Sequence, residues 1–244
     1  MFLSNKIRRN ICRASQIIYI MTKKILSLTL VICIVGLSCA FAVRAAKPTA
    51  HPISGYTVVI DAGHGGVDGG VTGIVTGVKE SDLNLLIANA LKREFENAGI
   101  NVVMTRTSAA GLYGAMSKGF KMRDMEKRKE IINSSGAEIM ISVHLNKFSD
   151  SERRGAQAFY KIGDERSKAL SESIQAEFNL GGRKYSSLKG DYYVLNESNC
   201  TAVLCECGFL SSAADEALLL TESHREKVAK SILTGTLKYL AENP

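Results

Sequence analysis

The sequence predicts a single α/β domain with a mostly parallel, twisted sheet of about six strands and helices on both faces. Two observations support this fold class. Short runs rich in β-branched residues alternate with longer segments in which apolar residues recur at helical spacing. The chain has 244 residues, of which 45% are hydrophobic, so it is long and apolar enough to bury one large core.

The first strand is expected at YTVVIDA, residues 56–62. From Ser81, a candidate N-cap, apolar residues recur at helical spacing up to Gly99, which is expected to end the helix. The next strand is INVVMTR, residues 100–106. This order of strand, helix and strand is typical of a parallel pair.

The remaining elements continue the alternation. They are a helix that ends near Gly136, strands at 137–144 and 155–161, a helix near 166–178, strands at 191–195 and 201–210, and a helix at 223–241. In the strand at 201–210, period-2 alternation points Cys205 and Cys207 to one face and Glu206 to the other. We expect both cysteines to be small buried core residues.

The N-terminal region differs from the rest of the chain in charge. Residues 1–44 hold seven basic residues and no acid, which leaves 24 basic and 24 acidic residues in the remainder. The folded part is therefore neutral, which argues against a nucleic-acid partner. An apolar run at 25–43 ends in the A-x-A triplet Ala40–Ala42, which is typical of a secretory signal, and the run is also long enough to span a bilayer.

We therefore interpret residues 1–44 as a signal peptide or an N-terminal membrane anchor that contacts the membrane, residues 45–55 as a linker and residues 56–244 as the functional domain. Either interpretation of the leader places that domain outside the cytoplasmic membrane. Met1 and Met21 are both candidate starts, because Met21 begins a more usual signal, MTKKILSLTLV.

Two histidines follow expected strands at the same edge of the sheet. His64 lies in DAGHGGVDGG, directly after the first strand, and His144 ends the strand at 137–144. In open α/β sheets ligands gather beyond the carboxyl ends of the strands, so we expect the two side chains to converge. The glycine-rich loop between His64 and Glu80 is long enough to bring that carboxylate to the same place. The glycines themselves predict a close approach of the backbone to a bound group.

Glu206 lies inside the apolar strand VLCECGFL. Burial of an unpaired carboxylate costs on the order of several kcal/mol, so this residue needs a cation, a proton or a metal beside it. Two imidazoles and one carboxylate suit Zn²⁺ and leave a coordination position for water, and a further carboxylate near that water can act as general base. Taken singly, His64 and His144 are also explained as turn or strand-end histidines, and Glu80 as a solvated acid in the first helical turn.

The motifs VVIDAGHGGVDGG, KES, MTR, SVHLN and CECGFLS occur in this order over nearly the whole of residues 56–240. They resemble those of the zinc-dependent N-acetylmuramoyl-L-alanine amidases of bacterial cell walls, the amidase_3 type. The resemblance implies that His64, Glu80 and His144 bind Zn²⁺ and that Glu206 is the catalytic glutamate. It also implies a domain that cuts the amide between N-acetylmuramic acid and the L-alanine of the stem peptide in peptidoglycan.

Asn146 and Arg106 are candidate substrate-binding residues, and Arg128 is a further one. Asn146 lies two residues beyond His144 and on the same strand face if the strand continues. For Asn146 the alternative role is that of a turn residue at the strand end. For the two arginines the alternative is to tie loops together.

The sequence is similar in particular to germination-associated spore-cortex amidases, since it contains no peptidoglycan-binding repeat and no extra helix between Glu80 and His144. This likeness implies a role in forming muramic-δ-lactam, an accessory exported protein as partner, and secretion to the cell wall or spore cortex or attachment to the membrane. The alternatives are a vegetative wall amidase in autolysis or cell separation, another zinc amidohydrolase or carboxypeptidase, and a non-catalytic wall-binding module.

Overall fold

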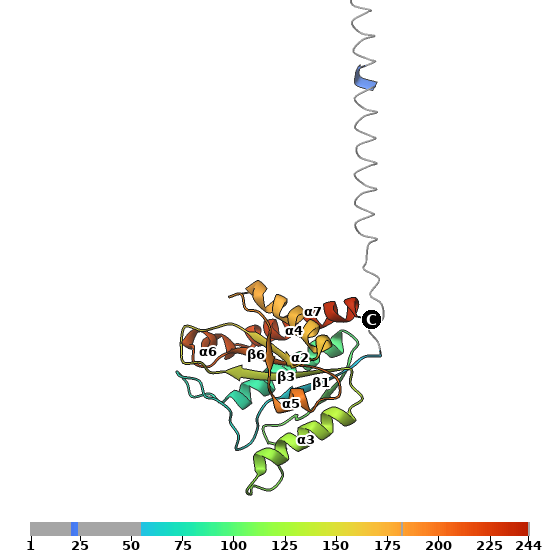
Figure 1. Cartoon of the computed structure of the whole chain (residues 1–244). Helices are drawn as coiled ribbons and strands as arrows, with labels where there is room; N and C mark the ends of the chain where they lie inside the picture. Colours follow the sequence, from blue (N-terminus) through green and yellow to red (C-terminus); the bar gives the residue numbers. More distant parts are fainter. Residues whose placement is uncertain (1–20, 24–54, 182, 244) are drawn as a thin grey trace, which may run out of the picture. The chain divides into compact units, whose positions relative to one another are not determined.

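The centre of the domain is a six-stranded sheet in the order β2-β1-β3-β6-β4-β5 (Figure 1). The computed structural model that shows it describes residues 21–23, 55–181 and 183–243. The strands are β1 (Thr57–Ala62), β2 (Asn101–Met104), β3 (Ile139–Asn146), β4 (Gln157–Lys161), β5 (Leu188–Gly190) and β6 (Thr201–Phe209). The first four strands in the sheet order run parallel, whereas β4 pairs antiparallel with β6 and parallel with β5. The predicted, mostly parallel sheet is therefore confirmed.

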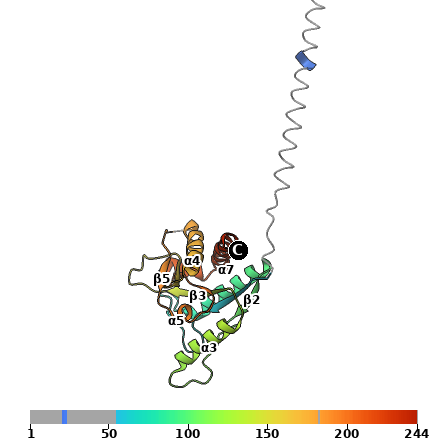
Figure 2. The ribbon, with the colours of Figure 1, turned by 45° about the vertical axis from the view of Figure 1, so that its right-hand side comes forward.

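Helices cover both faces of the sheet (Figures 1 and 2). On one face lie α2 (Glu80–Asn97), α4 (Glu165–Phe178) and α7 (Glu222–Glu242), and on the other lie α3 (Phe120–Ser134) and α5 (Tyr193–Asn196). The short helix α6 (Ala213–Leu219) follows β6 and contacts α7, and a 3-10 turn, Asn179–Gly181, follows α4. The predicted helices on both faces are present.

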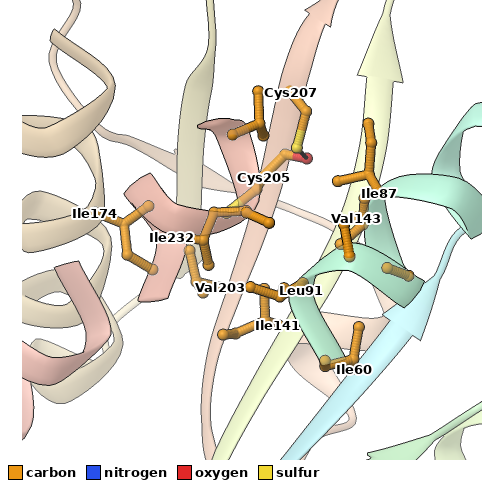
Figure 3. Packing of buried hydrophobic residues seen from close by; sticks show 14 of the residues in the cluster. Ile60, Ile87, Leu91, Ile141, Val143, Ile174, Val203, Cys205, Cys207 and Ile232 are labelled. Atoms are coloured by element: carbon orange, nitrogen blue, oxygen red, sulfur yellow. Dashed lines mark hydrogen bonds between the residues drawn. The ribbon is translucent and has the colours of Figure 1, made fainter. Parts of the chain in front are cut away.

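The larger hydrophobic core lies between the sheet and helices α2, α4 and α7 (Figure 3). Val203, Cys205 and Cys207 of β6 are all buried in it. Both cysteines are free thiols, and burial raises the pKa of each, so they stay protonated and unreactive. Because side chains alternate along a strand, Glu206 faces the opposite side, towards α3 and α5, as predicted.

One predicted strand, DYYVL at residues 191–195, is wrong. Most of this segment forms α5, and the strand is β5, which ends just before it. Val194 and Leu195 are adjacent in sequence and both are buried in the smaller core on the α3 side. A strand would point the two side chains to opposite faces, whereas a helical turn buries both. The turn is closed by a side-chain hydrogen bond of 2.7 Å that Asn196 donates to Asp191.

The N-cap of helix α2 lies two residues earlier than predicted. Lys79 is the N-cap residue, with φ −81° and ψ 140°, and Ser81 is buried inside the first turn instead of capping it. The backbone N–H of Glu80 donates to the carbonyl of Val71 over 2.8 Å, so the preceding loop satisfies this helix terminus. The end of the helix is as predicted, because Gly99 takes the left-handed conformation with φ +81°.

The predicted leader and linker lie outside the described residues, apart from residues 21–23 and Gly55. Residues 21–23 are helical and exposed. Within the part of the chain that the structure describes, no helix combines the length and the hydrophobicity needed to cross a membrane. The interpretation of residues 1–44 as a signal peptide or anchor therefore stays a prediction.

Candidate active site

The carboxyl ends of β1, β3 and β6 open into a cavity of about 370 Å³ on the side of the sheet that α3 and α5 cover. The sequence-predicted residues that line it are His64, Glu80, Arg128, His144, Asn146 and Glu206. The structure thus brings together side chains that are separated by more than half of the chain. Arg106 is not among the lining residues.

His64 lies in a turn that only a glycine-rich segment can form. Its own φ is +60°, a left-handed conformation that residues other than glycine rarely adopt, and Gly65 and Gly66 follow with φ +139° and +63°. A Cβ atom on Gly63 would overlap the His144 ring, and one on Gly70 would overlap the Glu80 carboxylate. The glycines therefore allow the backbone to approach the side chains of two candidate ligands closely, whereas the predicted approach to a bound group stays a prediction.

The candidate metal ligands His64, Glu80 and His144 each offer one donor atom, and these atoms lie within 4.8 Å of one another. Glu80 Oε1 is 3.2 Å from His64 Nε2 and 2.9 Å from His144 Nδ1. The Glu80 carboxylate is fixed by backbone N–H donors, from Val71 to Oε2 and from Leu145 to Oε1, over 2.9 and 3.1 Å. Two imidazoles and one carboxylate that converge at the wall of an open cavity fit a catalytic zinc ion.

Electrostatics also favour a cation at this point. Burial opposes charge on His64, yet Glu80 and Asp68 raise its pKa to about 9. Burial likewise opposes charge on Glu80, but hydrogen bonds and attraction from His144 and His64 hold the pKa of this carboxyl well below its usual range. The carboxylate therefore recruits positive charge, and a divalent cation supplies that charge without protonating a ligand.

Asp68 orients His64 and was missed by the sequence analysis. Its Oδ2 lies 2.9 Å from Nδ1 of His64, while Nε2 faces Glu80. Lys121 of α3 lies 3.7 Å from the other oxygen of Asp68. A carboxylate on the second ring nitrogen fixes the tautomer and the ring orientation of a metal-binding histidine. The available signal was the spacing, because Asp68 follows His64 by four residues in the same glycine-rich turn.

Replacement of Asp68 by asparagine is expected to weaken zinc binding by about 10- to 100-fold, because the amide holds the imidazole less firmly and leaves it less basic. Competition with a chromogenic chelator measures the dissociation constant directly. Asp82→Asn is the matched control, since Asp82 is an exposed acid in the first turn of α2. Equal zinc affinity in Asp68→Asn and the control would contradict the assigned role.

Two buried arginines hold the turn that carries His64. Arg106 donates from Nε to the carbonyl of Ala62 over 2.8 Å and from Nη2 to that of Gly63 over 2.9 Å. Arg128 of α3 donates from Nη1 to the carbonyl of Ala62 over 2.7 Å and from Nη2 to that of His64. Three consecutive carbonyls are thereby fixed. For both arginines this geometry favours the loop-tying alternative over contact with substrate.

Arg128 also joins two acids in a buried network that the sequence analysis missed. Its Nη1 lies 2.6 Å from Asp61 Oδ1, and its Nε lies 2.7 Å from Asp124 Oδ2. Asp61 further accepts hydrogen bonds from Thr105 and Ser142 over 2.7 and 2.8 Å. Burial opposes ionisation, but Arg128 and these hydroxyls lower the pKa of Asp61 to about 2. The sequence signal for this network was Asp61, an acid inside the apolar run VVIDA.

Glu206 lies beside the candidate ligands without bonding to them. It pairs in register with His144 across β3 and β6, and its side chain is buried. Among the described residues its Oε2 has no hydrogen-bond partner. Burial, assisted by the charge of Glu80, raises the pKa of Glu206 to about 7 against the opposing effect of the histidines. A carboxyl group with this pKa can both accept and release a proton near neutral pH.

Asn146 and helix α5 complete the cavity wall. Asn146 is half-buried, and its side-chain oxygen accepts a hydrogen bond of 2.7 Å from the backbone N–H of Lys147. Tyr192 and Tyr193 also line the cavity. The sequence analysis missed these tyrosines as site residues because it placed them in a strand of the sheet.

Comparison with known proteins gives a consistent assignment. The model of the N-acetylmuramoyl-L-alanine amidase family Amidase_3 matches residues 58–238. A germination-specific N-acetylmuramoyl-L-alanine amidase of Bacillus subtilis is 36% identical over 203 residues, which are 80% of this chain and 84% of that protein. The amidase LytC of the same species is 28% identical over 84% of this chain, but the match covers only 40% of LytC.

A solved structure agrees with these sequence matches. The CwlD amidase from Clostridioides difficile, determined in complex with the GerS lipoprotein, superposes with a TM-score of 0.74 and 36% identity. The superposition covers 77% of this chain and 100% of that chain. Because the family model spans most of the sequence, and relatives above 30% identity align over nearly all of the folded domain, the chain belongs to the N-acetylmuramoyl-L-alanine amidase family.

Proposed function

We propose that this protein is a zinc-dependent peptidoglycan hydrolase that cuts the amide between N-acetylmuramic acid and the L-alanine of the stem peptide. One observation carries the zinc mechanism: His64, Glu80 and His144 converge in a cavity beside Glu206, a buried carboxylate with an unpartnered oxygen. A structural metal site would need a fourth protein ligand, whereas three ligands beside a free carboxylate suit catalysis.

In the proposed mechanism, His64, Glu80 and His144 hold the ion. A zinc ion held there would supply Lewis acidity, which would lower the pKa of water and polarise the scissile carbonyl group. Glu206 accepts the proton of the attacking water through its free oxygen, and the protonated acid then donates that proton to the leaving nitrogen of L-alanine. Asn146 lines the same cavity and is proposed to contact the substrate, whereas we assign Arg106 to holding the metal-binding turn.

We further propose that the enzyme acts on spore cortex, where it would prepare muramic acid for conversion to muramic-δ-lactam. The germination-specific relative at 36% identity supports this context. The complex of the CwlD amidase with the GerS lipoprotein supports an accessory exported protein as a partner. Vegetative wall hydrolysis is the second candidate, supported by the similarity to LytC.

The proposed location is outside the cytoplasmic membrane, either free or anchored, because residues 1–44 combine basic charge with an apolar run. Protease treatment of intact protoplasts tests this proposal. Full protection of the folded domain would contradict it.

Digestion of purified cortex and vegetative peptidoglycan by the zinc-loaded chain tests the activity. We expect release of intact stem peptides that begin with L-alanine, identified by mass spectrometry, and faster release from cortex. Chelator-treated protein is the control and should release none. Shortened stem peptides would indicate a carboxypeptidase, and binding to the wall without any release would indicate a non-catalytic module.

A further inference from the structure

We infer that Lys147 and Arg153, on the segment between β3 and β4, form a cationic subsite that binds a carboxylate of the substrate peptide next to the scissile amide. This inference rests on the proposed function, because it assigns the peptide side of the cavity.

Arg153 is a positive charge held in place by aromatic rings. Its Cζ lies 4.4 Å from the ring centroid of Phe148, 5.2 Å from that of Phe209 and 5.4 Å from that of Tyr185. Its Nη2 donates a hydrogen bond of 2.8 Å to the neutral side chain of Gln157. Stacking on aromatic faces fixes the plane of the guanidinium without neutralising its charge.

Neither cation is compensated by an acid. In the part of the chain that the structure describes, neither Lys147 nor Arg153 forms an ion pair with a carboxylate. Arg153 is only half-exposed, so an ordinary solvated surface charge does not account for its environment. A partly buried guanidinium with unused N–H donors is suited to bind an external carboxylate in a bidentate manner.

The position of the subsite follows from the strand register. Gln157, which anchors Arg153, pairs with Glu206 across β4 and β6. A register shift between β3 and β6 pairs Phe209, whose ring contacts Arg153, with Asn146, a residue of the cavity wall. Lys147 lines the cavity directly. Lys147 therefore lies in the cavity wall directly after β3, and two of the residues that hold Arg153 are the strand partners of Glu206 and Asn146.

The charge of the rest of the cavity gives the subsite its selectivity. The other charged residues of the wall are mainly acids, namely Asp61, Asp68, Glu80, Asp124 and Glu206. The remaining cation, Arg128, is already paired with Asp61 and Asp124. Among the described residues that line the cavity, Lys147 is therefore the lysine or arginine without an acidic partner, and Arg153 adds a second such cation on the same segment.

In the substrate, the sugar side of the scissile bond is neutral, because the lactyl carboxyl of muramic acid is consumed in the amide. The peptide side carries carboxylates, and the nearest one belongs to the γ-linked glutamate that follows L-alanine. The subsite would thus orient the peptide towards β4 and leave the glycan on the other side of the cavity. Arg153 would supply a fixed fork, and Lys147 a flexible charge.

The test uses two soluble muramoyl-peptide glycan fragments that differ only in this glutamate, which is free in one and α-amidated in the other. Zinc-loaded full chain is assayed as wild type, Lys147→Gln, Arg153→Gln, Arg153→Lys and Lys168→Gln. The last variant is the matched control, because Lys168 is a solvent-facing cation of α4 whose ion-pair partner among the described residues is Glu165. Zinc content and melting temperature are recorded for each variant.

We expect wild type and Lys168→Gln to show a KM about 5- to 20-fold lower for the free-carboxylate fragment, with similar kcat. Arg153→Gln and Lys147→Gln should raise KM for that fragment and reduce the preference, while kcat, zinc content and KM for the amidated fragment change little. Arg153→Lys should retain more of the preference than Arg153→Gln, because lysine keeps the charge but lacks the bidentate geometry of the guanidinium. If Arg153 had only a structural role, its replacement would instead change KM by the same factor for both fragments.

Three results would overturn the inference, and the third is distinguishable from the first two. Equal KM for both fragments in wild type, or an undiminished preference in both glutamine variants, would remove the carboxylate subsite and leave the amidase proposal intact. No cleavage of either fragment at the muramoyl amide, with zinc bound, would overturn the proposed function and this inference together.

Discussion

Replacement of Glu206 by glutamine is expected to leave one zinc ion per chain and to lower turnover by about two to four orders of magnitude. The amide keeps the shape of the side chain but cannot accept the proton of the attacking water. Because Glu206 lies beside the candidate ligands without bonding to them, its loss should not release the metal. Metal analysis and peptide release from peptidoglycan measure the two effects separately.

The matched variants are His64→Ala, Glu80→Ala and His144→Ala, each of which removes a donor of the candidate site. These variants should lose zinc as well as activity, so the pattern over four proteins separates metal binding from proton transfer. Loss of zinc in Glu206→Gln would make Glu206 a ligand. Near-normal turnover in the same variant would remove it from the mechanism.

The pH dependence of turnover provides an independent check on Glu206. Burial raises its pKa to about 7, and the base must be deprotonated to act, so activity is expected to fall as the pH falls through this value. A bound divalent cation favours the carboxylate, so the acidic limb of the loaded enzyme should lie at or below pH 7. An acidic limb that persists in the residual activity of Glu206→Gln would have to be assigned to another group.

Replacement of Arg128 by methionine is expected to lower the free energy of unfolding by about 3–5 kcal/mol and to weaken zinc binding. The change leaves Asp61 as an unpaired buried carboxylate and frees the carbonyl of His64. Lys127→Met is the control on the same helix, since Lys127 is exposed and, within the described part of the chain, pairs with Glu130 alone. It should change stability by less than about 0.5 kcal/mol. Urea unfolding and chelator competition measure the two effects.

The pH dependence of the free energy of unfolding shows why Arg128→Met is less stable. In the wild type the pKa of Asp61 is lowered to about 2, so its contribution to stability is present above about pH 4 and is lost as the pH falls towards 2. In Arg128→Met the unpaired carboxyl should have a raised pKa, so the variant should gain stability relative to wild type as the pH falls. The double variant Asp61→Asn/Arg128→Met should recover part of the loss at neutral pH. A deficit independent of both pH and Asp61 would point to packing instead of charge.

The central strands could be predicted because each is a short apolar run bounded by turn residues, which is typical of a buried strand. Strand β6 is a buried, mostly apolar run in which Glu206 is the charged residue, which predicted a strand, and the period of two along a strand predicted the opposite directions of Cys205 and Glu206. The site could be predicted because carboxyl ends of parallel strands share one edge, so His64 and His144 had to converge. The glycines around His64 were the further signal, because a Cβ atom on Gly63 or Gly70 would overlap a candidate ligand.

Other features had no local signal. Val194 and Leu195 form a short apolar pair that suits a strand or a helical turn equally, and only the surrounding core decides between them. The N-terminus of α2 is satisfied by the loop carbonyl of Val71, so a residue with good capping chemistry, Ser81, was misleading. The partnership of Asp61 with Arg128 depends on how α3 packs against the sheet, which periodicity does not show.

The spread of the candidate ligands over the chain has a consequence for the lifetime of the protein. His64 and His144 meet only when β1 and β3 are paired in register, so the unfolded chain offers isolated imidazoles and no chelating site. A metal that binds only the folded state stabilises it, by about 4 kcal/mol when its free concentration is a thousand times the dissociation constant. The zinc supply where the domain folds should therefore govern its resistance to proteolysis as well as its activity, and a zinc-poor environment should shorten the life of the enzyme.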